Sequence, residues 1–274
     1  MLVDVDARVI RNTRLSADYN VIALAAPQIA EATQPGQFVM VKSAGGGDPL
    51  LRRPFSVFEV LRSNNRVEGL TLLSKRVGVT TKILYDAVEG DAISCLGPLG
   101  RPFETVKPPT EAWMVAGGVG LAPFATLGEA LLARGVKTTL FYGARSEAEL
   151  FYLDWFKSRD IRLILSTEDG SMGDKGRITL PLERELQRAA AEPMIYACGP
   201  EPMLEAVAHV AGRFNRPSQV SVERTMGCGM GGCYSCVIPV RDGAGSERTR
   251  PTGSHYVRSC IAGPVFRGDE IVWD

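Results

Sequence analysis

Four cysteines in the last fifty residues have a spacing that suits metal chemistry. Four residues separate Cys228 from Cys233, two separate Cys233 from Cys236, and a further 23 precede Cys260. This is the plant-type ligand spacing of a [2Fe-2S] cluster. Glycines at positions 227, 229, 231 and 232 allow the loop to fold back on itself and expose backbone N–H groups to the sulfur atoms. The pattern therefore predicts that these four thiolates hold a [2Fe-2S] cluster.

A structural zinc site is the alternative use of four cysteines. Zinc sites usually combine two closely spaced pairs, whereas Cys260 stands alone. An iron–sulfur site is therefore favoured over zinc. Of the six cysteines in the chain, Cys95 is expected to be a small apolar core residue.

Two short segments in the first third of the chain suit a flavin nucleotide. Arg53-Pro54-Phe55-Ser56 lies between β-rich runs, and an arginine fork binds a diphosphate while a serine hydroxyl could donate to a flavin ring nitrogen. Gly78, Thr80 and Thr81 precede an expected helix, where small and hydroxyl residues could seat a phosphate. The alternatives are a solvated strand edge at the first segment and a simple N-cap by Thr80 at the second.

A glycine-rich turn in the middle of the chain suits a pyrophosphate. Gly117, Gly118 and Gly120 join an expected buried strand to an expected helix, where glycine allows close approach and the helix dipole favours an anion. Cys198-Gly199-Pro200 ends a later strand of the same expected sheet, so a nicotinamide ring could stack over that turn. The alternative for Cys198 is a core cysteine at a tight turn.

The elements that must position these residues change in character along the chain. The first third predicts many short strands of a small barrel or sandwich, at 8–10, 20–25, 37–42, 56–61 and 70–73, with a helix over 80–87. After a linker at Pro108-Pro109, strands at 113–116, 138–142, 161–166 and 194–197 alternate with helices at 123–133, 147–157, 181–190 and 202–214. This alternation predicts a parallel sheet covered on both faces, with its ligand at the carboxyl ends of the strands.

Composition excludes some classes of partner. Lys plus Arg and Asp plus Glu both number 31, so no net charge favours nucleic acid or an anionic membrane surface. The uncharged run at 112–128 is broken by glycines and a proline, which argues against a membrane-spanning helix. No apolar leader is evident at the N-terminus, so a cytoplasmic protein is expected. Neither His209 nor His255 is expected to be catalytic.

Together, in this order, the motifs resemble those of the ferredoxin–NADP reductase superfamily. Cysteines placed after the nicotinamide motifs make the chain similar to the electron-transfer subunits of type B dihydroorotate dehydrogenases. The resemblance is carried by LLRRPFSV, GPLGRPF, GGVGLAPF, CGPEPML, ERTMGCGMGGCYSC and CIAGPVF. It implies a multi-domain protein: an antiparallel FAD-binding β-barrel over 1–107, an α/β parallel-sheet nicotinamide domain over 108–216, and a small [2Fe-2S] domain over 217–274.

The resemblance also implies roles for individual residues. Ser56 and Cys198 would be the catalytic residues, in contact with the reacting rings. Those that would bind FAD are Arg53, Pro54, Phe55, Ser56, Leu73, Ser74, Lys75, Gly78, Thr80 and Thr81. Those that would bind NAD(H) are Gly117, Gly118, Gly120, Cys198, Gly199 and Pro200. The chain departs from the family in having Ser74-Lys75 where tyrosine and arginine are usual, and an inserted segment at 44–48.

A partner protein is expected because the chain has no recognisable site for an organic substrate. The resemblance implies a flavin-containing, dihydroorotate-oxidising catalytic subunit in a hetero-oligomer, a heterotetramer in this family, acting in pyrimidine biosynthesis. The alternatives are a reductase serving an oxygenase, a hydrogenase or a ferredoxin-linked transhydrogenase, and a non-enzymatic redox sensor. Arg145-Ser146 could contact the 2′-phosphate of NADP, but Glu147 and Glu149 follow closely, and the resemblance favours NAD.

Overall fold

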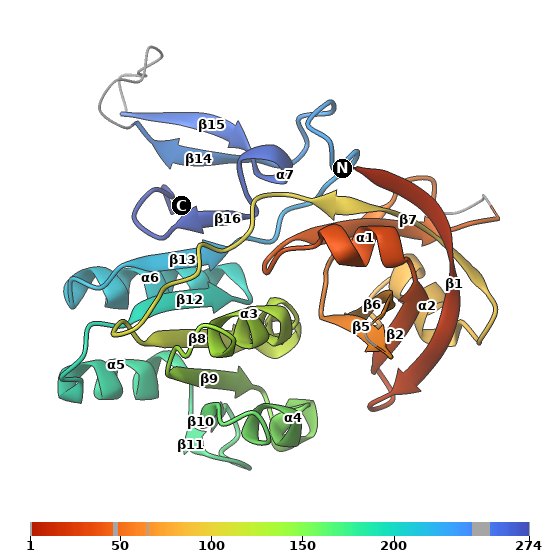
Figure 1. Ribbon diagram of the computed structural model, residues 1–274. Coiled ribbons are helices and arrows are strands. Elements are labelled where there is room, and N and C mark those ends of the chain that lie inside the picture. The colour runs from red at the N-terminus through yellow and green to blue at the C-terminus, as the bar shows by residue number, and fades with distance from the viewer. Residues whose placement is uncertain (1, 46–48, 65, 243–252, 274) are drawn as a thin grey trace.

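Three parts make up the molecule: a curled N-terminal sheet, a central sheet flanked by helices, and a C-terminal hairpin beside one edge of that sheet (Figure 1). The computed structural model describes residues 2–45, 49–64, 66–242 and 253–273. The predicted inserted segment at 44–48 and the predicted turn at Asn64-Asn65 therefore lie partly outside the described residues. Among the described residues, no helix is long and apolar enough to cross a membrane.

The N-terminal sheet has seven strands in the order β4-β3-β7-β1-β2-β6-β5, and every neighbouring pair is antiparallel. Contacts between β4 and β6 curl it into a barrel-like shape, which confirms the predicted fold class. The strands are β1 Val3–Arg14, β2 Tyr19–Ala25, β3 Phe38–Ser43, β4 Arg53–Ser56, β5 Glu59–Ser63, β6 Arg66–Lys75 and β7 Ala92–Leu99.

Strand β3 is buried on both faces, and its alternation explains how it joins two parts of the molecule. Val39 and Val41 belong to the core inside the curled sheet. Phe38 and Met40, which alternate with them, belong to a second apolar cluster on the opposite face. The strand therefore requires a covering element on its outer side.

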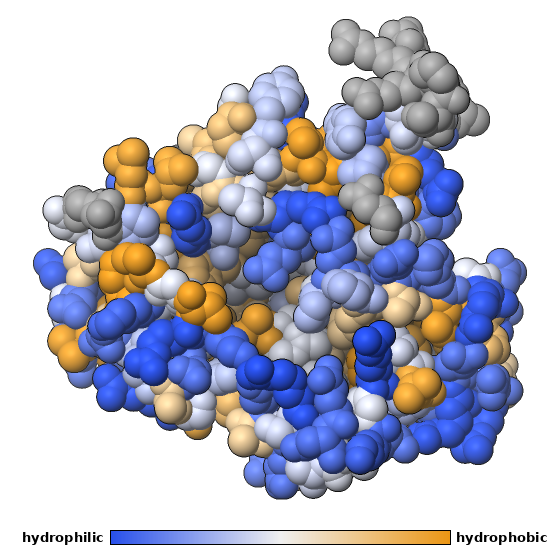
Figure 2. All heavy atoms as spheres, turned by 180° about the vertical axis from the view of Figure 1, so that it is seen from behind, coloured by the Kyte–Doolittle hydropathy of each residue, from blue (hydrophilic) through white to orange (hydrophobic). Residues whose placement is uncertain are grey.

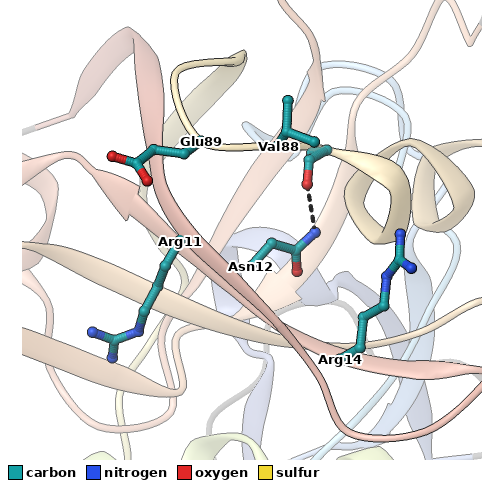
Figure 3. A pocket seen from close by; sticks show the side chains of 6 residues that line it. Arg11, Asn12, Arg14, Val88 and Glu89 are labelled. Atoms are coloured by element: carbon teal, nitrogen blue, oxygen red, sulfur yellow. Dashed lines mark hydrogen bonds between the residues drawn. The ribbon is translucent and has the colours of Figure 1, made fainter.

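Two helices pack against the N-terminal sheet: α1 Pro27–Ala32 and α2 Val79–Asp86. The end of α2 is tied to β1 by Asn12, whose amide donates to the carbonyl oxygens of Leu84 (2.8 Å), Tyr85 (3.1 Å) and Ala87 (2.9 Å). Figure 3 shows this amide at the floor of a surface hollow between Arg11 and Arg14. Because its donors are already engaged, Asn12 has a structural role there.

The central sheet runs β11-β10-β9-β8-β12-β13-β16, parallel except for the last pair. Met114 and Ala116 of β8 face the core beneath α3 and α4, whereas Trp113 and Val115 face α5 and α6. Helices therefore cover both faces, as predicted (Figure 1). The strands are β8 Ala112–Gly117, β9 Thr138–Ala144, β10 Arg162–Thr167, β11 Asp174–Lys175, β12 Met194–Cys198, β13 Ser218–Ser221 and β16 Val265–Arg267; the helices are α3 Pro123–Leu132, α4 Leu153–Lys157, α5 Thr179–Arg188 and α6 Glu201–Arg213.

Two sequence expectations were wrong in detail. The helix predicted over 147–157 is only a 3-10 turn, η2 Glu147–Glu149, followed by the short α4. Tyr152 has a left-handed backbone (φ 61°) and its ring packs on Phe58 between β4 and β5, so a tertiary contact interrupts the helix. The strand predicted over 56–61 is broken between β4 and β5.

The C-terminal segment returns to the central sheet. The hairpin β14 Val237–Arg241 and β15 Ser254–Arg258 leads into α7 Ser259–Ala262, and β16 then pairs with β13. Ile238 and Val240 pack into the same apolar cluster as α5 and α6. The boundary between 216 and 217 stays a prediction, and strands on its far side, β13 and β16, complete the central sheet.

Candidate functional site

Two turns meet at the centre of the parallel sheet. Successive strands run outward from β8 in one direction and restart at β12 on its other side, so the nucleotide crevice of a parallel sheet is expected at the loops that follow β8 and β12. A Cβ at Gly120 would overlap the carbonyl of Cys198 and lie 2.7 Å from the Cα of Gly199. The two turns therefore pack so closely that only glycine fits at position 120.

The other glycines of these turns have distinct environments. A Cβ at Gly117 would lie 2.7 Å from the Sδ of Met203 and 3.0 Å from the Cδ of Pro200. Gly118 has a φ of +53° and faces open space, in the 3-10 turn η1 Gly118–Leu121 that precedes α3. A backbone open to solvent at the start of a helix suits an anionic group. The structure thus brings the predicted nicotinamide residues of both turns together.

Cys198 lies at this crevice with a protonated thiol. Burial raises the pKa of Cys198 to about 12, although a hydrogen bond with Ser221 acts in the opposite direction. The residue, which is the last of β12, is partly exposed. At neutral pH it offers an uncharged, polarisable surface of the kind that a neutral ring requires. Its catalytic role stays a prediction.

The arginine–serine motif forms strand β4. Ser56 pairs with Phe38 and Arg53 with Val41, and the Arg53 guanidinium donates to the carbonyl oxygens of Leu51 (3.3 Å) and Arg52 (3.2 Å) at the surface. Contacts between β4 and β6 place the motif beside the strand that carries the predicted FAD residues Leu73, Ser74 and Lys75. Two separate sequence segments therefore lie close together in the curled sheet.

The end of β6 carries a polar group that suits a ligand. The hydroxyl of Ser74 is buried and has no hydrogen-bond partner among the described residues. Such an orphaned group is costly unless a further molecule satisfies it, and FAD beside β4 would supply acceptors. Leu73 is buried in the central core, and Lys75 lies over the ring of Tyr19 (4.8 Å).

The predicted phosphate seat at α2 is an ordered helix start. Gly78 is the N-cap, and the hydroxyl of Thr81 accepts from the N–H groups of Val77 and Gly78 (both 2.9 Å) and donates to the Gly78 carbonyl. Thr80 is buried, so the capping role suggested for it belongs to Thr81. The FAD role of these residues stays a prediction.

The four predicted cluster ligands form two pairs, and in the first pair Cys228 is half-buried and Cys233 is exposed. The Cys228 sulfur accepts from the N–H groups of Met230 (3.4 Å) and Gly232 (3.2 Å), and the Cys233 sulfur accepts from the N–H of Cys228 (3.4 Å). The hydroxyl of Ser235, 3.2 Å from the Cys233 sulfur, is the main cause that lowers the pKa of Cys233 to about 6. The loop therefore stabilises the thiolate of Cys233, the form that binds metal.

The second pair is buried. The N–H of Ser259 donates to the carbonyl of Cys236 (2.9 Å), which brings Cys260 on α7 beside Cys236. Burial first, and Cys236 next, raise the pKa of Cys260 to about 12. Loading iron must therefore release a proton from this pair.

Two pairs of thiols fit two irons better than one zinc ion. A single ion needs three or four ligands around one centre, whereas each iron of a [2Fe-2S] cluster takes two of the four thiolates. The donor set and the N–H groups directed at sulfur fit a [2Fe-2S] cluster.

The cysteine loop lies directly on the N-terminal sheet. Cys236 and Cys260 share one apolar cluster with Phe38 and Met40 of β3, and the other members are Leu96, Leu99 and Met226. Phe38 and Met40 pair in register with Ser56 and Pro54 of the arginine–serine motif. Seen from behind, the surface of the molecule is hollowed near its middle (Figure 2).

Sequence reasoning missed the contacts that join the central domain to the N-terminal sheet. The loop after β9 packs Phe151 against Tyr19 (ring centroids 4.9 Å apart). Within it, the carboxylate of Glu149 lies 3.4 Å from the ammonium of Lys75. No local pattern identifies such a contact, because its two halves are 74 residues apart.

Comparison with known proteins agrees with this organisation. Residues 114–209 match the oxidoreductase NAD-binding domain, and residues 223–272 match the iron-sulfur cluster binding domain of dihydroorotate dehydrogenase B. Over 98% of this chain and 91% of the other, the fold matches an NADH-dependent reduced ferredoxin-NADP oxidoreductase, with a TM-score of 0.83 and 28% identity.

Curated relatives cover nearly the whole chain. The dihydroorotate dehydrogenase B (NAD(+)) electron transfer subunit of Geobacillus kaustophilus is 38% identical over 92% of this chain and 91% of its own. That of Desulforamulus reducens is 34% identical over 98% of both chains. The resemblance identified from the motifs is therefore confirmed: the chain belongs to the family of dihydroorotate dehydrogenase B electron transfer subunits.

Proposed function

We propose that this chain carries electrons between NAD(H) and a flavin-containing, dihydroorotate-oxidising catalytic subunit. The proposal rests on one observation: the cysteine loop packs against β3, which pairs with the strand of the arginine–serine motif. Electrons hop efficiently only between centres that lie close together. A cluster held by Cys236 and Cys260 would adjoin a flavin held on β4.

In this proposal, the residues of this chain bind the cofactors and the nicotinamide nucleotide and orient them. Bound FAD would supply hydride exchange with NAD(H) and single-electron exchange with the cluster. The flavin would be held by Arg53, Ser56 and Ser74. The irons would be held by the four cysteines. The nicotinamide nucleotide would be held by the turns at Gly117–Gly120 and Cys198–Pro200, which pack closely against each other. Hydride exchange needs no protein acid or base, which agrees with the protonated thiol of Cys198.

Exposed apolar side chains around the cysteine loop support a protein partner. Met230 (51% exposed), Tyr234 (63%) and Ile261 (49%) surround or adjoin the cluster ligands. Grouped apolar exposure is typical of an interaction surface. We place the catalytic subunit there, in a cytoplasmic hetero-oligomer, because that position adjoins the predicted cluster.

The test begins with the anaerobically purified chain. We expect bound flavin, two irons and two inorganic sulfides per chain, and bleaching of the visible spectrum on addition of NADH. Assembled with its catalytic subunit, the chain should support dihydroorotate-dependent reduction of NAD+. Zinc without inorganic sulfide would contradict the cluster assignment. Stable copurification with a redox enzyme that does not oxidise dihydroorotate would contradict the partner.

A ferredoxin-linked transhydrogenase is the second candidate. The similarity to a reduced ferredoxin-NADP oxidoreductase over almost the whole chain favours it among the alternatives. Supplying reduced ferredoxin in place of dihydroorotate in the same assay separates the two. Activity with ferredoxin alone would favour the second candidate.

A further inference from the structure

The loop after β9 contains a charged cluster centred on Glu149. Arg145 donates from Nε to one carboxylate oxygen of Glu149 at 3.1 Å, and a terminal guanidinium nitrogen contacts the other oxygen. The ammonium of Lys75 lies 3.4 Å from that second oxygen. The Glu149 side chain is only 16% exposed, whereas that of Arg145 is 68% exposed. A well-shielded carboxylate thus holds an otherwise accessible guanidinium by a two-point contact.

The order of the strands places this cluster along the path of a dinucleotide. If the nicotinamide end lies at the β12 turn and the pyrophosphate at the β8 turn, the adenosine half extends over β9 and β10. The loops after β9 and β10 are joined there. The N–H of Asp169 donates to the carbonyl of Arg145 (3.2 Å), and the N–H of Glu147 donates to the hydroxyl of Ser171 (2.8 Å).

The charges of these loops discriminate between the two nicotinamide nucleotides. NADP differs from NAD by a 2′-phosphate on the adenosine ribose, and a nearby arginine is the usual group that accommodates it. Here the guanidinium of Arg145 is already paired with Glu149. The carboxylates of Glu168 and Asp169 are exposed beside it and would repel a phosphate.

We propose that Glu149 is a specificity-determining residue that favours NAD(H) over NADP(H) by withholding Arg145 from a 2′-phosphate. Exposed ion pairs are individually weak, but the two-point geometry and the second cation, Lys75, keep this carboxylate ionised and oriented. The inference rests on the proposed function, because it assumes a nicotinamide nucleotide in the crevice. It deepens that function by naming the substrate class that the site rejects.

The test compares kcat/KM for NADPH and NADH in the flavin- and cluster-loaded protein, with ferricyanide as electron acceptor. We expect Glu149→Gln to raise the NADPH-to-NADH ratio by about tenfold, the effect of one charge-assisted hydrogen bond gained by the phosphate. Glu147→Gln is the matched control, because it removes the same charge from the same loop. Within the described part of the chain, Glu147 makes no ion pair that this substitution would break. It should change the ratio less than about threefold. The double variant Arg145→Ala/Glu149→Gln should return the ratio to that of the unmodified protein.

A binding measurement keeps the inference independent of turnover. Calorimetric titration measures the affinity of each variant for 2′,5′-ADP and for 5′-ADP. In Glu149→Gln, the affinity for 2′,5′-ADP should rise and the affinity for 5′-ADP should stay the same. Equal gains in Glu149→Gln and Glu147→Gln would overturn the inference, because net charge would then account for them. No gain in either variant would overturn it as well. If the protein does not oxidise NADH but 2′,5′-ADP binding responds as expected, the proposed function fails and the specificity inference stands.

Discussion

Gly229 lies against Met40 in a contact that only a glycine permits. Its φ is +73°, and a Cβ at this position would lie 2.6 Å from the Cγ of Met40. Met40 pairs in register with Pro54 of the arginine–serine motif. The loop that carries Cys228 therefore rests on the strand next to the predicted flavin strand, and the distance between the two predicted redox sites depends on this contact.

Gly229→Ala should separate the two sites. The added methyl group must displace Met40 or lift the loop, so we expect reduction of the cluster by NADH to slow by about tenfold or more, as for displaced reaction partners. Stopped-flow absorbance of flavin and cluster measures the rate. Gly135→Ala is the control, because Gly135 has a φ of +72° but no atom near its Cβ position. Equal slowing in both variants would show that backbone strain alone is responsible.

Cys260→Ser should abolish the iron centre but leave the flavin in place. Cys260 lies in the buried pair with Cys236, and a serine oxygen is a poor replacement for a thiolate. The iron and sulfide content should fall to below about a tenth of that of the unmodified protein. NADH should still reduce the flavin. The control is Cys95→Ala, which alters a buried core cysteine outside the loop. Retention of a full iron content in Cys260→Ser would exclude Cys260 as a ligand.

Gly120→Ala should weaken the interaction with NADH. A Cβ there would overlap the Cys198 carbonyl, so the two nicotinamide turns must move apart. We expect the KM for NADH to rise by about tenfold or more, with flavin reduction by dithionite unchanged. Gly212→Ala, at an open position near the end of α6, should leave the KM unaltered. An unaltered KM in Gly120→Ala would contradict the assignment of the crevice.

Phe103→Ala should destabilise the junction between the N-terminal sheet and the central domain. Phe103 is buried and packs against Phe124 (ring centroids 6.1 Å apart) and Tyr196 (5.5 Å). We expect a loss of about 3–5 kcal/mol in the free energy of unfolding, measured by denaturant titration. Leu180→Ala, on the exposed face of α5, should change it by less than about 0.5 kcal/mol. Similar losses in both variants would show that Phe103 contributes no special packing.

Glu59 should make stability depend on pH. Burial, with repulsion from Glu129, raises the pKa of Glu59 above its ordinary value of 4.5. Between 4.5 and the raised value the folded protein binds more protons than the unfolded chain, so this group's contribution to stability falls as pH rises through that window. Glu59→Gln should remove this part of the pH dependence. Denaturant titrations of both proteins from pH 4 upward measure it, and parallel curves would contradict the expectation.

Local patterns in the sequence were sufficient to identify much of the fold. Strand–helix alternation predicted the parallel sheet, because the period of apolar residues reflects which side chains a sheet or helix buries. The exception at 147–157 is instructive. Its residues favour a helix, yet Phe151 and Tyr152 pack on Tyr19 and Phe58, and this packing outweighs the helical propensity.

The sequence alone determined the chemistry of the motifs, because a tight loop with three cysteines and a glycine turn after a strand act through near neighbours in the chain. Only the tertiary structure decided which motifs meet. Three contacts join residues that are far apart in sequence: Cys236 lies beside Cys260, Gly229 packs against Met40, and Glu149 forms an ion pair with Lys75. Such contacts depend on how whole sheets pack, which no local spacing of residues encodes.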